Sequence, residues 1–260
     1  MEYQNLYVGA CMRRLISTAY SEHSAESYDI KRFRRPSGKL FAQLEQEILS
    51  KAISKISLNS SVLEVGAGTG RFSLHLAKQG YRINLIDLSR PMLRICKDKF
   101  CEQKLGFSAY HCSSTHLPFR SCSFDFVFAI RLLNQLPFIE AALQTIREML
   151  RVCKTGGYVL FEFVNRDSLS RIGACARETT FLSMRILLQD LGNLTSEFSV
   201  ESKWGILFFS QSVLEKIPTM ELKEIFLGVD NFFSSVAPLH TTRCYIMLNK
   251  IATPKLKNQK

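Results

Sequence analysis

The chain has 260 residues and a formal net charge of +11 at pH 7, and 46% of its residues are hydrophobic. That length suits one domain with an elaboration, and the apolar content is ample for a packed core. The longest apolar candidate for a membrane span, residues 124–139, contains charged residues and a proline and is better explained as a strand and a loop. Arg13 and Arg14 interrupt the apolar patch near the N-terminus, a pattern unlike a signal peptide.

Positive charge gathers at residues 31–39 and in a basic tail at 255–260. Such clusters indicate an anionic substrate, a nucleic-acid partner, or a solvated face, and the solvated face is favoured because Phe33 is the one aromatic residue in the first cluster. The eight cysteines form no CxxC pair, and several fall in expected helices or strands. We therefore expect a reduced, cytoplasmic protein without a metal site.

The elements expected in chain order alternate between helices and strands. A short helix near 7–19 and a loop come first, and apolar residues at helical spacing over 41–56 predict a helix before the first strand. The following pattern predicts strands at 61–65, 81–86, 107–111, 124–130 and 158–164, with helices at 71–79, 91–102 and 138–152. Apolar strands separated by helices indicate an α/β fold with a doubly wound, mostly parallel sheet buried on both faces.

After residue 165 this rhythm breaks. Residues 166–194 read as helical and are too long for a simple connection, so we expect an insertion that covers the active site. A strand at 204–209, helices over 212–228 broken at Pro218, and a final strand at 244–248 complete the expected fold. The predicted organisation is an N-terminal lid or extension at 1–39 and a single domain at 40–260.

The most informative segment is 62–70, which reads Val-Leu-Glu-Val-Gly-Ala-Gly-Thr-Gly. A buried strand carrying Glu64 is followed by three glycines and then by a helical pattern, as at the start of a nucleotide-binding α/β unit. Glycine is needed where the backbone turns sharply and a ligand approaches its N–H groups. A second strand ends at Asp87, about 20 residues beyond the first glycine, where a ribose-binding carboxylate belongs. Arg71 stands where a dinucleotide motif requires its third glycine.

Four motifs resemble class I S-adenosylmethionine-dependent methyltransferases, in the small-molecule (type 11-like) branch. They are the glycine segment, Ile86–Ser89 with Pro91–Leu93, the Leu-Pro-Phe stretch at 117–127, and the helix and Gly-Gly turn at 147–157. The match covers roughly residues 40–165. The resemblance implies a seven-stranded Rossmann-like sheet, whose last strand is commonly antiparallel, and S-adenosylmethionine as the cofactor.

The resemblance also implies roles for particular residues. The glycine turn would line the methionine part of the cofactor, Glu64 would support that turn, and Asp87 would accept hydrogen bonds from both ribose hydroxyls. Leu88 and Met92 would pack on the adenine. The cofactor-binding residues expected from the central motifs are Glu64, Gly66, Ala67, Gly68, Gly70, Asp87, Leu88, Met92, Ser113, Ser114 and Ile130.

The chain departs from the family's pattern before Leu117. The family usually carries an acid that hydrogen-bonds the adenine amino group, and here Ser113 and Ser114 occupy that place. A serine hydroxyl accepts that bond more weakly than a carboxylate does. The replacement of the acid by serine therefore puts the adenine contact in question.

Residues after the fourth strand face the methyl donor in this architecture. Families that methylate nucleic-acid bases often carry Asp/Asn-Pro-Pro-aromatic there, whereas this chain has Ile130, Arg131 and Asn134 in that stretch. Arg131 is a candidate for binding the cofactor carboxylate or an anionic substrate. Methyl transfer from a sulfonium requires alignment above all, so no catalytic residue is evident. Arg131, Asn134 and His23 are weak candidates.

Residues 28–33 resemble the Tyr-Asp-x-x-Arg segment that closes over the cofactor in many small-molecule methyltransferases. Tyr28 and Arg32 are therefore added to the cofactor-binding residues, and residues 20–35 are expected to form a lid.

The favoured function is methyl transfer to a small-molecule acceptor by direct displacement. An RNA (tRNA) or protein methyltransferase is the alternative that the basic charge supports, and nucleic acid is not favoured as a partner. An alternative of another class is a catalytically silent, cofactor-binding scaffold. The intact glycine motif and Asp87 argue against that scaffold. These motifs identify neither the acceptor atom nor the oligomeric state.

Overall fold

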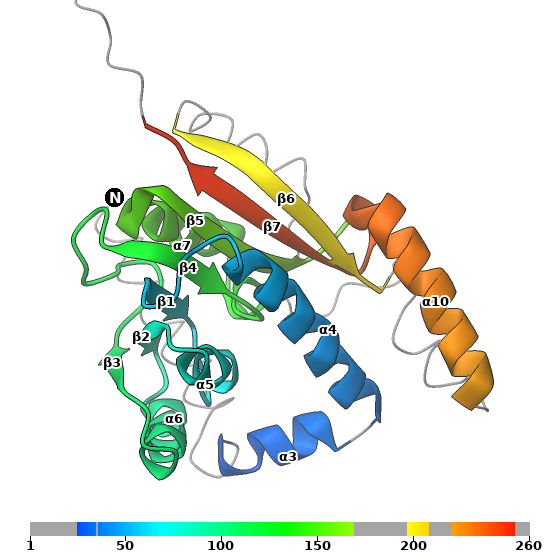
Figure 1. The fold of residues 1–260 in the computed structure, drawn as a ribbon, viewed down its shortest axis with the longest axis horizontal. Coiled ribbons are helices and arrows are strands. Elements are labelled where there is room, and N and C mark those ends of the chain that lie inside the picture. Colours follow the sequence, from blue (N-terminus) through cyan, green and yellow to red (C-terminus); the bar gives the residue numbers. More distant parts are fainter. Residues whose placement is uncertain (1–24, 35, 169–196, 208–219, 253–260) are drawn as a thin grey trace, which may run out of the picture.

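The computed structural model describes residues 25–34, 36–168, 197–207 and 220–252. Figure 1 shows one twisted sheet flanked by helices, and the strand order is β3-β2-β1-β4-β5-β7-β6. β1 to β5 pair in parallel, whereas β7 is antiparallel to both of its neighbours. The strands are β1 (Ser61–Val65), β2 (Arg82–Asp87), β3 (Phe107–His111), β4 (Phe124–Ala129), β5 (Cys153–Val164), β6 (Phe198–Ile206) and β7 (Arg243–Lys250). The doubly wound, seven-stranded, mostly parallel sheet is confirmed.

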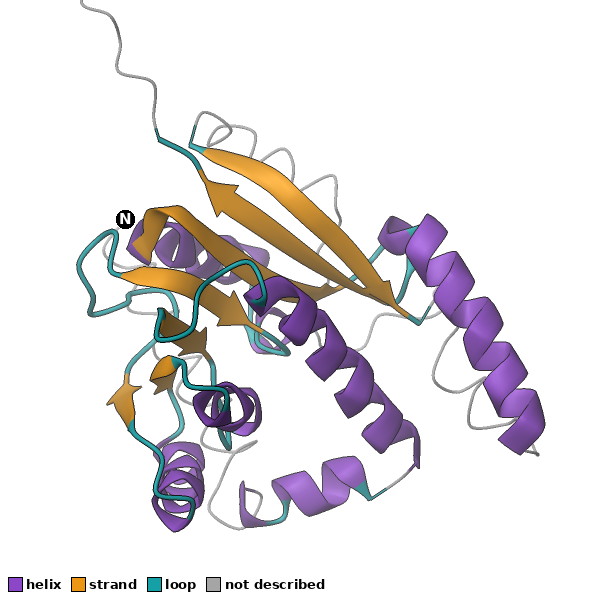
Figure 2. Cartoon of the chain, in the orientation of Figure 1, coloured by secondary structure: helices purple, strands orange, loops and turns teal. Residues whose placement is uncertain are grey.

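Helices cover both faces of the sheet, as Figures 1 and 2 show. Side chains of α4, α5 and α6 pack in one apolar cluster, and those of α7 pack in the other. The helices and 3-10 turns are α3 (Tyr28–Phe33), α4 (Pro36–Ile53), α5 (Arg71–Lys78), α6 (Arg90–Glu102), η1 (Leu133–Gln135), α7 (Ile139–Val152), α10 (Met220–Val236) and η3 (Pro238–His240). Within these ranges, no helix combines the length and apolar character needed to cross a bilayer.

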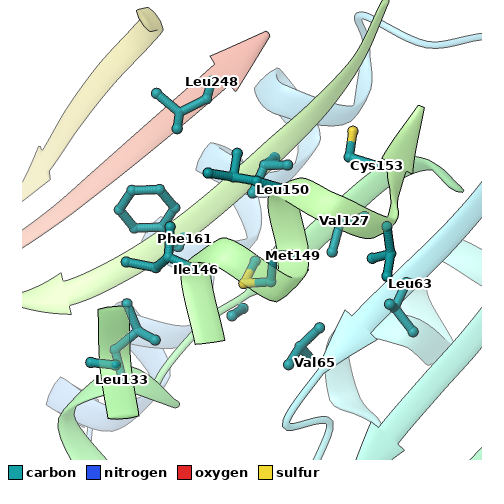
Figure 3. Close-up of a cluster of buried hydrophobic side chains, with 14 of the residues drawn as sticks. Leu63, Val65, Val127, Leu133, Ile146, Met149, Leu150, Cys153, Phe161 and Leu248 are labelled. Carbon is teal, nitrogen blue, oxygen red and sulfur yellow. The ribbon is translucent and has the colours of Figure 1, made fainter. Parts of the chain in front are cut away.

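The core against α7 shows how the sequence pattern builds the sheet. Figure 3 shows Ile146, Met149 and Leu150 of α7 lying against Val127 of β4 and Phe161 of β5. The three helix residues fall on one face because they are three and four positions apart. Strands buried on both faces need apolar side chains on both, which is why β4 and β5 read as nearly continuous apolar runs.

The strand order reverses at β1, which lies between β2 and β4. The chain that leaves β1 and the chain that leaves β4 therefore turn to opposite faces of the sheet. In open α/β sheets, ligands bind at the carboxyl ends of the strands at such a reversal. The segments at this edge are the glycine turn at 66–70, the end of β2 and the turn at 130–132. This edge is where a ligand is expected in an open α/β sheet.

Several expected element limits are wrong. α4 spans Pro36–Ile53, so it begins five residues before and ends three residues before the helix predicted over 41–56. β5 begins at Cys153 rather than 158, because Cys153 already pairs with Phe124 before the register shifts. β6 spans Phe198–Ile206, earlier than the expected 204–209, since an edge strand with exposed polar residues has no continuous apolar run.

The remaining differences lie after residue 165. α10 continues to Val236, eight residues beyond the predicted end at 228. The helix predicted at 7–19 lies outside the described residues, as do all but 166–168 of the insertion predicted at 166–194 and the first part of the 212–228 segment.

Gly70 is required by helix packing. Its φ is +76°, and a Cβ built there would lie 2.3 Å from Sγ of Cys96 on α6. Gly70→Ala should therefore lower the free energy of unfolding by about 2–5 kcal/mol, from overpacking together with left-handed strain. Urea unfolding measures the change. Gly80→Ala is the matched control, because Gly80 has a φ of +94° and open space around its Cβ position. Equal losses in the two variants would contradict the packing explanation.

Candidate functional site

The glycine turn is held against β2 by backbone hydrogen bonds. The N–H groups of Gly66 and Ala67 both donate to the carbonyl of Ile86, each at 2.9 Å. Gly66, Gly68 and Gly70 have φ values of +77°, +55° and +76°, a region that favours glycine. A Cβ at Gly66 would lie 2.8 Å from Cδ1 of Leu132, so the turn after β4 packs directly on this glycine.

Gly68 differs from its two neighbouring glycines because no atom lies within 4 Å of its Cβ position. Its N–H donates to Oδ2 of Asp87 at 2.7 Å, and the N–H of Ser89 donates to Oδ1 at 2.8 Å. Burial raises the pKa of Asp87, and the N–H groups of Ser89 and Gly68 oppose that shift. The N–H of Leu88 is a third donor to Asp87, and a carboxylate with about four acceptor positions still has room for a further donor. An open glycine backbone beside a carboxylate that can accept another hydrogen bond fits the ribose of a nucleoside.

Glu64 lies beneath the same turn. It is buried, and its Oε2 accepts hydrogen bonds from the hydroxyl of Ser73 and, at 3.1 Å, from the N–H of Ser73. Burial raises the pKa of Glu64 to about 8, against the opposing hydrogen bonds from Ser73 and the charge of Arg71. Ser73 is in the first turn of α5, whose N–H groups have no partner within the helix. Glu64 therefore fixes where the helix starts after the glycine turn.

Helix α3 lies against the glycine turn from the other side. Oδ1 of Asp29 accepts a hydrogen bond from the hydroxyl of Thr69 at 2.9 Å, and Oδ2 pairs with Nζ of Lys99. The same ammonium donates to the carbonyl of Thr69 at 3.2 Å. Thr69 lies between two glycines of the turn, so Asp29 connects the N-terminal helix to the centre of the site. The guanidinium of Arg32 stacks over the ring of Tyr28, 5.6 Å from its centroid.

The turn after β4 contains a strained residue. Arg131 has a φ of +63°, a conformation that costs a residue with a side chain about 1–3 kcal/mol. Its N–H donates to Oε2 of Glu162 at 2.8 Å, and its Nε pairs with Oε1 of Glu45. Nε of the guanidinium is therefore engaged by a protein carboxylate, and the anion-binding role of Arg131 stays a prediction.

These contacts belong to a buried ionic network at the carboxyl edge of the sheet. Oε2 of Glu45 accepts from Arg71 at 2.6 Å, and Arg243 of β7 pairs with Oε1 of Glu162. Both glutamate side chains are fully buried, and burial raises the pKa of each while nearby arginines oppose the shift. The hydroxyl of Tyr245 is buried beside the network and has no hydrogen-bond partner in the described part of the chain. Removing one member of such a network leaves an uncompensated buried charge.

The other predicted site residues are distributed unevenly. Leu88 is half-buried at the end of β2, and Met92 is buried in α6 near that end. The Ser113 hydroxyl bonds that of Thr115 at 2.9 Å, whereas the Ser114 hydroxyl is buried against Thr145 of α7, also at 2.9 Å. Both hydroxyl groups therefore have partners within the protein, and the adenine contacts of Ser113 and Ser114 stay predictions.

Ile130 and Asn134 flank the strained turn. Ile130 is buried in the apolar cluster that α4 covers. Asn134 is buried in η1, and within the described ranges its Oδ1 has no hydrogen-bond partner. His23 lies outside the described residues. No group of His, Cys, Asp and Glu side chains able to hold a metal ion occurs in the described segments.

Sequence reasoning assigned no role to Glu45, Glu162 or Asp29. Asp29 stands within the Tyr-Asp-x-x-Arg segment expected to close over the cofactor. Glu45 falls on the apolar face of its helix, between Phe41 and Leu49, and Glu162 stands inside an apolar strand. An acid on a buried face must be paired or hydrogen-bonded, so both positions point to a network. Their partners could not be read from the pattern.

The raised pKa of Glu64 makes a prediction about stability. Between the unfolded value of 4.5 and the folded value of about 8, the folded protein holds a proton that the unfolded chain has lost. Glu64 therefore makes stability fall with rising pH in this window, by up to about 1.4 kcal/mol per unit.

Glu64→Gln keeps a neutral acceptor for Ser73 and removes this titration. In urea unfolding between about pH 5 and 8, the difference in unfolding free energy between variant and wild type should shift in favour of the variant as pH rises. A difference that stays constant with pH would show that Glu64 is ionised throughout.

Residues 63–161 match the family described as "Methyltransferase domain". A malonyl-[acyl-carrier protein] O-methyltransferase of Marinomonas sp. (strain MWYL1) is 29% identical over 165 residues, which cover 61% of this chain and 59% of that protein. A ubiquinone/menaquinone biosynthesis C-methyltransferase of Cupriavidus pinatubonensis is 32% identical over 102 residues, 38% of this chain and 41% of that protein. The chain thus spans less than two thirds of the length of these relatives.

Solved structures share the fold. The methyltransferase complexed with the Haloferax volcanii Trm112 activator has a TM-score of 0.60 at 15% identity, over 89% of this chain and 96% of that one. The [4+2]-cyclase SpnF has a TM-score of 0.59 at 19% identity, over 81% and 82% of the two chains. The family match shows a methyltransferase domain at residues 63–161, and the geometry of its site fits S-adenosylmethionine as the cofactor. The solved structures show the same fold.

Proposed function

We propose that this protein transfers a methyl group from S-adenosylmethionine to a small-molecule acceptor by direct displacement. The observation that carries the proposal is the pairing of Asp87 with the open backbone of Gly68 at the carboxyl edge of the sheet. The cofactor supplies a methyl group already activated on a sulfonium. The protein's part is then to bind, align and exclude water.

In this proposal the residues divide the cofactor site among them. Asp87 accepts hydrogen bonds from the ribose hydroxyls, with Leu88, Met92 and Ser113 around the adenine. The glycine turn, steadied by Glu64, receives the methionine end. Gly66, Ala67, Gly70, Ser114 and Ile130 shape the walls by packing, and Tyr28 and Arg32 belong to the helix that closes the site.

A small-molecule acceptor is supported by the names of two relatives, a malonyl-[acyl-carrier protein] O-methyltransferase and a ubiquinone/menaquinone biosynthesis C-methyltransferase. The parts of the chain expected to bind the acceptor contain no recognised motif. The fold alone does not identify the reaction, because a [4+2]-cyclase has the same fold. The free cysteines among the described residues support a reducing location, and the cytoplasm is part of this proposal.

An RNA acceptor is the second candidate, and the formal charge of +11 is the observation that favours it. The small-molecule and RNA functions are distinguished by incubating the protein with tritium-labelled S-adenosylmethionine and one acceptor at a time. The acceptors are malonyl-acyl carrier protein, quinone precursors and bulk tRNA. Label on a small molecule or carrier supports the proposal. Label on tRNA, with binding that weakens steeply as salt rises, replaces it with the RNA function. Cofactor binding with no transfer to any class would favour a silent scaffold.

Asp87→Ala tests the ribose assignment. Losing charged hydrogen bonds should weaken binding of S-adenosylmethionine and of S-adenosylhomocysteine by about 1.5–3 kcal/mol in calorimetry. Asp98→Ala is the matched control, because Asp98 is an exposed acid on α6. Unchanged affinity in Asp87→Ala would remove the carboxylate from the cofactor site.

Asp29→Ala tests the closing helix. We expect hydrogen exchange over residues 25–34 to slow when S-adenosylhomocysteine binds, and Asp29→Ala should abolish that slowing because it removes the contacts with Thr69 and Lys99. Glu26→Ala changes a carboxylate that is 63% exposed on the same segment and should retain the slowing. If the hydrogen-exchange rate over residues 25–34 of the wild-type protein does not change when the ligand binds, α3 does not close over the ligand.

A further inference from the structure

One carboxylate connects the two loops at the centre of the site. Glu45 projects from α4 and is fully buried, with one oxygen on Arg71 and the other on Arg131. Arg71 is the first residue of α5, directly after the glycine turn, and Arg131 is the strained residue after β4. The carboxylate thus ties the start of one loop's helix to the backbone turn of the other.

The same two loops touch each other directly. Leu132 lies against Gly66, where a Cβ would come within 2.8 Å of it. Any rotation of the Arg131 turn would therefore move Leu132 relative to the glycine backbone. Because the turn is left-handed at a residue with a side chain, its geometry persists only while surrounding groups hold it. Those groups are Glu45, which holds the guanidinium, and Glu162, which holds the N–H.

The strand order indicates which part of the cofactor lies near the Arg131 turn. Asp87 ends β2 on one side of β1, and Arg131 follows β4 on the other side. If the ribose lies on Asp87, as in the proposed function, a ligand that crosses the glycine turn extends toward Arg131 with its amino-acid end. The adenine and ribose stay on the far side of β1.

We propose that Glu45 is a positioning residue for the amino-acid end of the cofactor, acting through the Arg131 turn. This inference rests on the proposed function and names a residue that the family's motifs do not include. Glu45 touches no ligand in this account. It sets the distance between the glycine turn and the turn after β4, and so the width of the space where the amino-acid chain lies.

The competing explanation is that Glu45 merely fastens α4 to the sheet. The two explanations differ in which ligand they affect. Methylthioadenosine carries the adenine, ribose and sulfur but lacks the amino-acid chain, whereas S-adenosylhomocysteine carries both parts. A positioning role at the amino-acid end alters binding of S-adenosylhomocysteine alone. A general structural role alters binding of both.

Calorimetry with both ligands on wild type and Glu45→Gln tests the proposal. We expect the variant to bind S-adenosylhomocysteine about 3- to 30-fold more weakly, the range for mutations that act through a neighbouring element. Methylthioadenosine affinity should stay within about twofold, as for an independent site. Asp87→Ala should weaken both ligands. Glu201→Gln, in an exposed pair with Lys55, is the control for a change of charge.

Each result decides the matter. Equal weakening of both ligands, or no weakening of either, overturns the positioning role while the proposed function stands. A wild-type protein that binds neither ligand overturns the proposed function and this inference together. If Glu45→Gln does not fold, Glu45→Gln combined with Arg131→Gly is measured, because glycine adopts the positive φ freely and removes the guanidinium that Glu45 neutralises. Selective weakening of S-adenosylhomocysteine is again expected, and equal weakening again overturns the role.

Discussion

Buried carboxyl groups beneath the loops at the carboxyl edge of the sheet are the constraint on which the site depends. Glu64 accepts from Ser73, Asp87 from Gly68 and Ser89, and Glu162 from Arg131. Each donor is a backbone N–H in a loop or in the first turn of a helix, where neither a strand ladder nor the helix supplies a partner. A buried carboxyl oxygen is a strong acceptor in a low-dielectric surrounding, and it holds such a turn in one geometry.

Three glycines at equal spacing have three different reasons to be glycine. Gly66 makes room for Leu132, Gly70 makes room for Cys96, and only Gly68 faces open space. The motif predicts a glycine turn because spacing in sequence reflects local backbone geometry. It does not say which glycine meets a ligand, since the neighbours of each come from segments far away in the chain.

The same distinction between local and distant information explains what could be predicted. Alternating apolar strands and helices, and the antiparallel final strand, follow from local periodicity or from the family resemblance, and they are present in the structure. The pairing of Glu45 with Arg131 joins residues 86 positions apart, and that of Arg243 with Glu162 joins residues 81 positions apart. No local pattern encodes such partners, although an acid on an apolar face indicates that a partner exists. Edge strand β6 was misplaced for a related reason, because its exposed polar residues hide its pattern.

The central claim is that the cofactor lies along the edge from Asp87, over Gly68, to the turn at Arg131. A crystal structure of the protein with S-adenosylhomocysteine tests it most directly. The account predicts ribose hydroxyls on the Asp87 carboxylate and the amino-acid end between the glycine turn and the Arg131 turn, with the Glu45 pairs intact. A ligand bound elsewhere, or bound with Asp87 still directed only at backbone N–H groups, would contradict it.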